Sequence, residues 1–214
     1  MDYRCAAASL EGFVQQLAAC YLPHGYHHYV VGVVPPEKDP AAVDAKLVSK
    51  YGVALSRWQR ARRKRGGWAN LHYLRWERFW VMAATDGEHP FFVEEAKNLR
   101  DARAVPIKVG GYAIQLRQGH AHVRIEEGEF QRLKAWLLEL APQRSAAELG
   151  RAFWCVPWEP YAPVRSQLFG LLSAVNVRRK RAGEEPVSSA SIRRRRRLVR
   201  PFEPPQAAER QEAA

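Results

Sequence analysis

Residues 69–85, Ala-Asn-Leu-His-Tyr-Leu-Arg-Trp-Glu-Arg-Phe-Trp-Val-Met-Ala-Ala-Thr, are the stretch that decides the fold. Aromatic and β-branched residues favour strands, and the Asp86-Gly87 pair that follows is a turn signal. The stretch therefore predicts one long strand or two short ones. At a period of two residues, Tyr73 falls on one face, and Trp76 and Trp80 share the other.

The segments before this stretch predict a strand and two helices. Residues 28–34 are β-branched and aromatic, which is typical of a buried strand. An aspartate-proline pair then starts a helix over residues 40–51, and Gly52 ends it. Residues 53–65 predict a second helix, with Trp58 facing inward and the arginines facing outward.

The remaining segments add helices and a hairpin. Apolar residues at helical spacing predict an opening helix over residues 5–20. Residues 107–125 predict a β-hairpin. Further helices are expected over residues 129–141, 145–153 and 163–181, the first with a clear apolar stripe.

The order of strand, helices, strands and helix predicts an α+β protein with a mainly antiparallel sheet packed with helices. A split β-α-β core of the ferredoxin-like kind is one arrangement that satisfies this order. We expect residues 1–181 to form a single domain. Residues 182–214 are rich in proline, glutamate, serine, arginine and alanine, and this composition predicts a basic, disordered tail.

Composition excludes several classes of protein. The chain has 214 residues, of which 47% are hydrophobic, so it can bury a core and is not disordered throughout. It has no apolar stretch long enough to span a membrane, and its first residues do not resemble a secretory signal. Three widely spaced cysteines favour a reducing, cytoplasmic location over a disulfide framework.

The positive charge is strongly segregated. The chain has 34 basic and 22 acidic residues, and 16 of the basic residues lie in three clusters, which leaves the rest slightly acidic. Such clusters repel internally unless a polyanion neutralises them. The clusters are Arg57, Arg60, Arg62, Arg63, Lys64 and Arg65; Arg178, Arg179, Lys180 and Arg181; and Arg193, Arg194, Arg195, Arg196, Arg197 and Arg200.

Aromatic residues interleave with the first cluster. Trp58, Trp68 and Tyr73 lie near its arginines, and Arg75 follows. Flat rings stack on unpaired bases, so this mixture favours RNA or single-stranded DNA over a smooth duplex, although the same rings would also suit a core. The leading interpretation is a binding protein rather than an enzyme. We expect it to need no cofactor and to act within a nucleoprotein complex.

One alternative is an enzyme. His120 and His122 flank a single alanine on a predicted strand, so both side chains fall on one face. This pair resembles the motif of the HUH nucleases, a group of transposases, relaxases and plasmid replication initiators of mobile elements and plasmids. The resemblance implies a divalent metal held by the histidines and a tyrosine nucleophile on a later helix. Tyr161 is the nearest match, but it lies in a proline-rich loop just before the last helix.

A second alternative is a duplex-binding regulator. Residues 44–65 resemble the helix-turn-helix of bacterial DNA-binding domains, with Gly52 in the turn and the arginine-rich segment as recognition helix. The resemblance implies a dimer bound to one duplex site. Separately, His24 and His27 precede the first predicted strand and His28 begins it. No carboxylate or cysteine lies at the usual ligand spacing, so no metal site is predicted there.

Overall fold

The aromatic stretch forms a tight hairpin of two strands, β3 (Leu71–Trp76) and β4 (Phe79–Ala84), in the computed structural model, which describes residues 3–203. The turn contains two residues, and the first of them, Glu77, has a φ of 50°. Across the hairpin Trp76 pairs with Phe79, and Arg75 pairs with Trp80. Because paired residues share a face, Trp76 and Trp80 lie on opposite faces, and the expectation that they share one is wrong.

This hairpin is the centre of a five-stranded sheet with the order β1-β3-β4-β2-β5. The other strands are β1 (Ala6–Ala7), β2 (His28–Val33) and β5 (Arg100–Asp101). Strand β2 runs antiparallel to both β4 and β5, whereas β1 runs parallel to β3. The sheet is therefore mainly antiparallel, and the predicted α+β class is confirmed.

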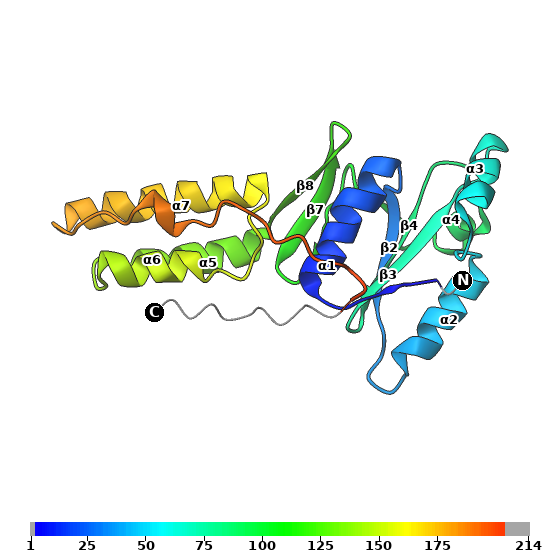
Figure 1. Cartoon of the computed structure of the whole chain (residues 1–214), viewed down its shortest axis with the longest axis horizontal. Coiled ribbons are helices and arrows are strands. Elements are labelled where there is room, and N and C mark those ends of the chain that lie inside the picture. Colours follow the sequence, from blue (N-terminus) through cyan, green and yellow to red (C-terminus); the bar gives the residue numbers. More distant parts are fainter. Residues whose placement is uncertain (1–2, 204–214) are drawn as a thin grey trace. The chain divides into compact units, whose positions relative to one another are not determined.

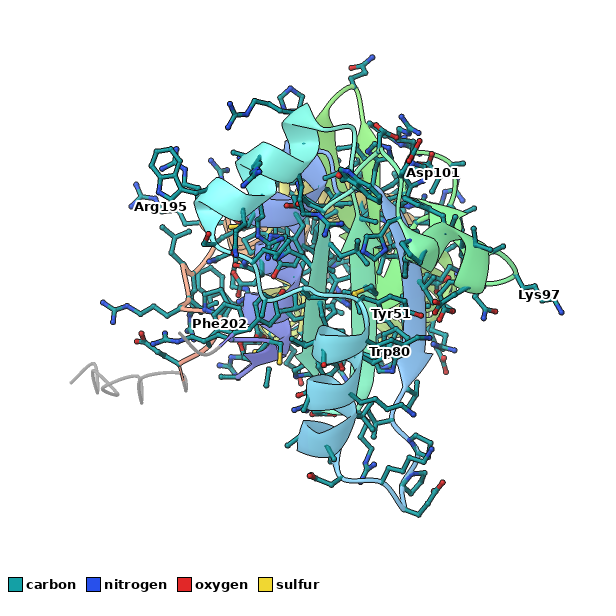
Figure 2. All side chains as sticks on the ribbon, turned by 90° about the vertical axis from the view of Figure 1, so that its right-hand side faces the viewer. Tyr51, Trp80, Lys97, Asp101, Arg195 and Phe202 are labelled. Carbon is teal, nitrogen blue, oxygen red and sulfur yellow. The ribbon has the colours of Figure 1, made fainter. Side chains whose placement is uncertain are left out.

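Three helices connect strands of this sheet. Helices α2 (Pro40–Lys50) and α3 (Arg57–Arg65) lie between β2 and β3 in the chain, and α4 (Pro90–Glu94) lies between β4 and β5. Asp39 caps α2 by accepting two backbone hydrogen bonds, and Gly52 follows its end with a φ of 58°, as the sequence predicts. Tyr51 and Trp80 lie at one face of the sheet (Figure 2). The core on this face consists of Val30, Tyr51, Val53, Leu71, Tyr73, Met82, Ala84 and Phe91.

The opposite face is covered by the first helical segment. Helix α1 (Leu10–Gln15) continues into a π-helix, η1 (Gln16–Tyr21), and a 3-10 turn, η2 (Leu22–His24). The ring of Phe13 meets Phe79 edge-on at 5.8 Å, and Tyr21 stacks on His72 at 4.3 Å. The predicted opening helix thus begins later, at Leu10, where Ser9 caps it.

A second sheet has the order β6-β7-β8, with strands β6 (Ile107–Val109), β7 (Tyr112–Arg117) and β8 (His120–Ile125). The predicted hairpin is confirmed, and both residues of its Gln118-Gly119 turn have positive φ.

The chain divides into two units, and the second sheet contributes residues to both. Among the described residues, unit 1 comprises 3–107, 115–121 and 199–203, and unit 2 comprises 108–114 and 122–198.

Unit 2 is mainly helical (Figure 1). It contains α5 (Glu127–Leu140), α6 (Ala146–Trp154), α7 (Ala162–Arg181) and a 3-10 turn, η3 (Ser189–Ser191). Helix α5 packs beside α7. The apolar side chains on one side of α7 are all buried, namely Val164, Leu168, Leu171, Leu172 and Val175.

The chain after α7 turns back along this helix within unit 2. Val187 and Ile192 are buried, and Asn176 exchanges hydrogen bonds of 2.8 and 3.0 Å with the backbone of Val187. These contacts were not anticipated from the composition of the segment. Residues 204–214 of the predicted tail lie outside the described residues, and its disorder stays a prediction.

Candidate nucleic-acid interface

Helix α3 is short, and six of its nine residues are basic. Its nine residues, Arg-Trp-Gln-Arg-Ala-Arg-Arg-Lys-Arg, include no carboxylate, and none of them is buried. The helix starts at Arg57 rather than at the predicted residue 53, because Ser56 and Gln59 form a reciprocal capping box. It ends at Gly66, and Gly67 follows with a φ of 78°.

Two arginines fasten α3 to the rest of unit 1. Arg60 donates hydrogen bonds to the backbone carbonyls of Leu55, Leu71 and Val53 at 3.2, 2.7 and 2.7 Å. Arg63 donates to the carbonyl of Ala69 at 3.0 Å. These guanidinium groups satisfy carbonyls that would otherwise need another donor, so their first role is structural.

The other cationic side chains of α3 point into solvent. Within residues 3–203, no carboxylate lies within ion-pair distance of them. Trp58 is 82% exposed and Trp68 is 47% exposed, so the expectation that Trp58 faces inward is wrong. We define the α3 surface as Arg57, Trp58, Arg62, Lys64, Arg65 and Trp68.

A shallow depression lies beside this surface. It has a volume of about 430 Å³, within the range of small-ligand pockets. Arginine and tryptophan side chains share its wall, and the guanidinium of Arg63 lies 6.0 Å from the centre of the Trp68 ring. The lining residues are Leu55, Gln59, Arg62, Arg63, Gly66 and Trp68.

Two residues predicted to join this surface lie elsewhere. Tyr73 is fully buried, and its hydroxyl donates to Asp44 at 2.7 Å. Burial, followed by the hydrogen bond to this carboxylate, raises the pKa of Tyr73 above its ordinary value. Arg75 forms a bidentate ion pair with the same carboxylate. Neither side chain is available to a base or a phosphate, so both are left out of the α3 surface.

The second cluster is at the C-terminal end of α7. Arg178, Lys180 and Arg181 are exposed, and the helix dipole favours cations at this end. Arg179 is only 1% exposed and donates to the carbonyls of Ala141 and Arg144, both at 2.6 Å. One of the four predicted contact residues is therefore a structural arginine.

The third cluster contains a second depression. Arg193 donates to the carbonyls of Val156 and Trp158, whereas Arg194–Arg197 are exposed. Trp154, which is 53% exposed, shares the wall of this depression. Its lining is Trp154, Ala190, Ile192, Arg193, Arg194, Arg195 and Arg197. Arginine and an exposed tryptophan thus lie together in each unit.

The second and third clusters are not brought together. Arg165 donates to the carbonyl of Arg194, which places the third cluster near the start of α7. Arg178 follows 13 residues later on the same helix, about 20 Å along its axis at 1.5 Å per residue. Arg200 belongs to unit 1, where it forms an exposed ion pair with Glu203 at 2.9 Å.

The residues of the nuclease interpretation are distributed as follows. His120 is exposed at the start of β8 and falls in unit 1, whereas His122 is partly buried and falls in unit 2. Tyr161 precedes α7 as its N-cap residue rather than lying on the helix. Its ring meets Tyr112 at 6.4 Å and lies 4.4 Å from the Arg196 guanidinium. The nuclease interpretation stays a prediction.

The helix-turn-helix interpretation meets two differences in geometry. Helix α2 ends at Lys50 and α3 begins at Arg57, so six residues separate them, against the three or four that are typical of this motif. No residue of α3 is buried, whereas a recognition helix packs one face against its domain.

A cluster that the sequence does not reveal lies at the end of the sheet where β2 and β3 begin and β4 ends. His27 and His28 both contact Asp86 Oδ1, through Nε2 atoms at 3.2 and 2.9 Å. The hydrogen bond from His28, with a smaller contribution from His27, lowers the pKa of Asp86. Sequence spacing could not indicate this group, because almost sixty residues separate the histidines from the aspartate.

Comparison with known proteins assigns no family to the chain. No family model matches the chain, and the search of curated proteins found no match. Among residues 3–203, no helix combines the length and apolar character that a membrane crossing requires.

Proposed function

We propose that the chain is a nucleic-acid-binding protein that holds single-stranded DNA or RNA on the α3 surface. The observation that carries this proposal is one helix with exposed cations, no acidic residue and two exposed tryptophans at or beside it. Cationic side chains neutralise phosphates, and exposed rings stack on unpaired bases.

Two further features support binding of a single strand. The depression beside α3 places Trp68 next to two arginines, which suits an unstacked base close to its phosphate. Unit 2 repeats this chemistry, with Trp154 among Arg193–Arg195 and Arg197. The exposed Arg178, Lys180 and Arg181 would add phosphate contacts without sequence preference.

We further propose a ferredoxin-like core within unit 1. The chain order β2, α2 and α3, β3, β4, α4 and β5 is the β-α-β-β-α-β order of that fold.

The three cysteines are free, which is in keeping with a reducing cytoplasm. Exposed arginines in both units would suit a component of a nucleoprotein complex, and this role needs no cofactor.

The test is fluorescence anisotropy with a labelled 20-nucleotide single strand, as DNA and as RNA, and with the matching duplex. We expect single strands to bind more tightly, with affinity falling steeply as salt rises. The variant R57Q/R62Q/K64Q/R65Q should bind weakly. The slope of the logarithm of the binding constant against the logarithm of the salt concentration should become less steep by about 3. Four phosphate contacts are lost, and each contributes about 0.7 to this slope for single strands.

The matched control removes four exposed cations elsewhere in unit 1. Lys38, Lys46, Lys97 and Arg117 are exposed and lie outside α3, so the variant K38Q/K46Q/K97Q/R117Q has the same change in net charge. It should bind nearly as well as the natural chain. The proposal would be overturned if both variants lost the same amount of affinity, if affinity did not change with salt concentration, or if the protein bound duplex more tightly than single strands.

A further inference from the structure

The His27–His28–Asp86 cluster places three potential metal ligands at one point. One ligand atom of each residue lies within 4.8 Å of the other two, and both Nε2 atoms lie within 3.2 Å of Asp86 Oδ1. The imidazole rings of the two histidines are 4.5 Å apart and inclined by 51°. All three residues belong to unit 1.

The backbone brings adjacent histidines to the same carboxylate. Successive side chains of a strand point to opposite faces, so neighbours in a regular strand could not both reach Asp86. His28 is the first residue of β2, and His27 lies just before it. Asp86 lies two residues beyond the end of β4, the strand paired with β2. The cluster thus lies at the end of the sheet. His27 is outside the regular strand there, so its side chain is not bound to alternate with that of His28.

Neighbouring elements hold the histidines in place. The carbonyl of His27 accepts a 2.8 Å hydrogen bond from Ala102, and His28 pairs with Asp101 of β5. Phe92 of α4 meets the His28 ring edge-on at 5.4 Å. Figure 2 shows Asp101 at this edge of the sheet, where Arg103 neutralises its carboxylate.

The cluster is also open on one side. The side chains of His27 and His28 are 6% and 22% exposed, whereas that of Asp86 is 74% exposed. An ion could enter from solvent beside the aspartate and meet two largely buried imidazoles. Two histidines and one carboxylate are the ligands of many catalytic zinc sites, which keep a further position for water or substrate.

We propose that His27, His28 and Asp86 bind one divalent transition-metal ion, such as Zn²⁺ or Co²⁺, with at least one coordination position left for water or a phosphate oxygen. Imidazole selects ions of this kind over Mg²⁺, which prefers oxygen ligands alone. Both Nε2 atoms contact a carboxylate oxygen in the structure, so each imidazole has to present an unprotonated Nε2 when the ion binds.

The site lies on the same loop system as the α3 surface. Two residues after Asp86, Glu88 exchanges backbone hydrogen bonds with Gly67 and Ala69, on either side of Trp68. A bound ion would thus belong to the loop that adjoins the proposed strand-binding surface. The metal proposal does not depend on nucleic-acid binding, because its test uses the ion alone.

The experiment is a titration of the full-length, chelator-treated C20S/C155S protein with Co²⁺, followed by visible absorption, and with Zn²⁺, followed by calorimetry. Replacing the two exposed cysteines removes competing thiolate ligands. We expect one saturable site and no competition by tenfold excess Mg²⁺. The variant D86N should weaken Co²⁺ binding by more than about 100-fold, beyond the 10–100-fold loss typical of outer-shell changes.

Matched variants separate the cluster from other histidines. His24 and His120 are exposed histidines of unit 1 outside the cluster, so H24A and H120A should bind Co²⁺ as the parent does. H28A should bind as weakly as D86N. The exposed position of Asp86 makes D86N the variant that is expected to fold, which circular dichroism without metal checks. No saturable site, or unchanged binding in D86N and H28A, would overturn the proposal.

Discussion

Arg75 and Asp44 form a bidentate ion pair between the central hairpin and α2. The Nε and Nη2 atoms of Arg75 donate to Asp44 Oδ1 and Oδ2, each at 2.8 Å. The two side chains are 13% and 10% exposed. Tyr73, on the same strand and face, donates its hydroxyl to the same carboxylate at 2.7 Å. An arginine that resembles a phosphate ligand in the sequence is therefore part of a buried polar network.

Asp44→Asn should destabilise the protein strongly. It would leave the Arg75 guanidinium largely buried without its counter-charge, and breaking a buried pair from one side costs about 3–5 kcal/mol. Urea unfolding followed by circular dichroism measures the change. Glu94→Gln is the control, because it breaks the exposed Lys50–Glu94 pair and should leave stability nearly unchanged. Equal stability of the two variants would contradict this assignment.

Arg60 and Arg62 should behave oppositely although they lie two residues apart on α3. Arg60→Gln removes hydrogen bonds to three backbone carbonyls, so we expect a loss of about 1–3 kcal/mol in the free energy of unfolding. Arg62→Gln should change stability by less than about 0.5 kcal/mol but weaken binding of a single strand. Urea unfolding and anisotropy on both variants check this. A stable R60Q would show that Arg60 does not fasten the helix.

Much of the fold follows from local signals in the sequence. The Asp39-Pro40 pair marks the start of α2, and apolar residues at helical spacing mark the buried stripe of α7, so both are recognised without tertiary context. The sequence does not signal the two-residue turn after Trp76, because neither Glu77 nor Arg78 is a usual turn residue. Without this turn, a period of two residues assigns every later residue of the stretch to the wrong face of the sheet. For this reason Trp80 is predicted on the face opposite to the one it occupies.

The candidate sites were less predictable because charge alone does not reveal a partner. Arg62 and Arg63 are neighbours in sequence, yet one is exposed and the other bonds a carbonyl. Which arginine meets a carbonyl depends on tertiary contacts that a charge run does not encode. The sequence indicates only a turn at Asp86, and the contact of this residue with His27 and His28 requires the pairing of β2 with β4.

Arg179 provides the corresponding distinction in unit 2. Its guanidinium joins α7 to the carbonyls of Ala141 and Arg144, at the connection between α5 and α6. Arg179→Met keeps the aliphatic length but leaves buried carbonyls without donors, so we expect a loss of at least about 2 kcal/mol. Arg178→Met, one exposed residue earlier, should change stability little. Thermal unfolding of both variants tests this, and similar melting temperatures would refute the structural role of Arg179.

His72 is enclosed by aromatic residues on the face covered by α1 and η1. Its ring stacks on Tyr21 with the planes inclined by 3°, and its Nδ1 lies 3.1 Å from the Tyr3 hydroxyl. Burial lowers the pKa of His72 to about 3, and the nearby charge of Arg60 acts in the same direction. The folded protein thus holds this imidazole neutral over the range in which the unfolded chain binds a proton.

Stability should therefore fall as the pH decreases below 6.5, the ordinary pKa of the side chain. The contribution of His72 is complete above that pH. It decreases by about 1.4 kcal/mol per pH unit down to about pH 3, because only the unfolded chain takes up the proton in this window.

His72→Phe keeps a flat ring against Tyr21 and cannot be protonated. Urea unfolding at pH 7 and pH 5 should show a loss about 2 kcal/mol smaller in the variant than in the natural chain. His89, whose pKa burial also lowers, contributes equally to both proteins and cancels in this difference. The same loss in both would mean that His72 becomes protonated in the folded state, and that the ring is not enclosed as described.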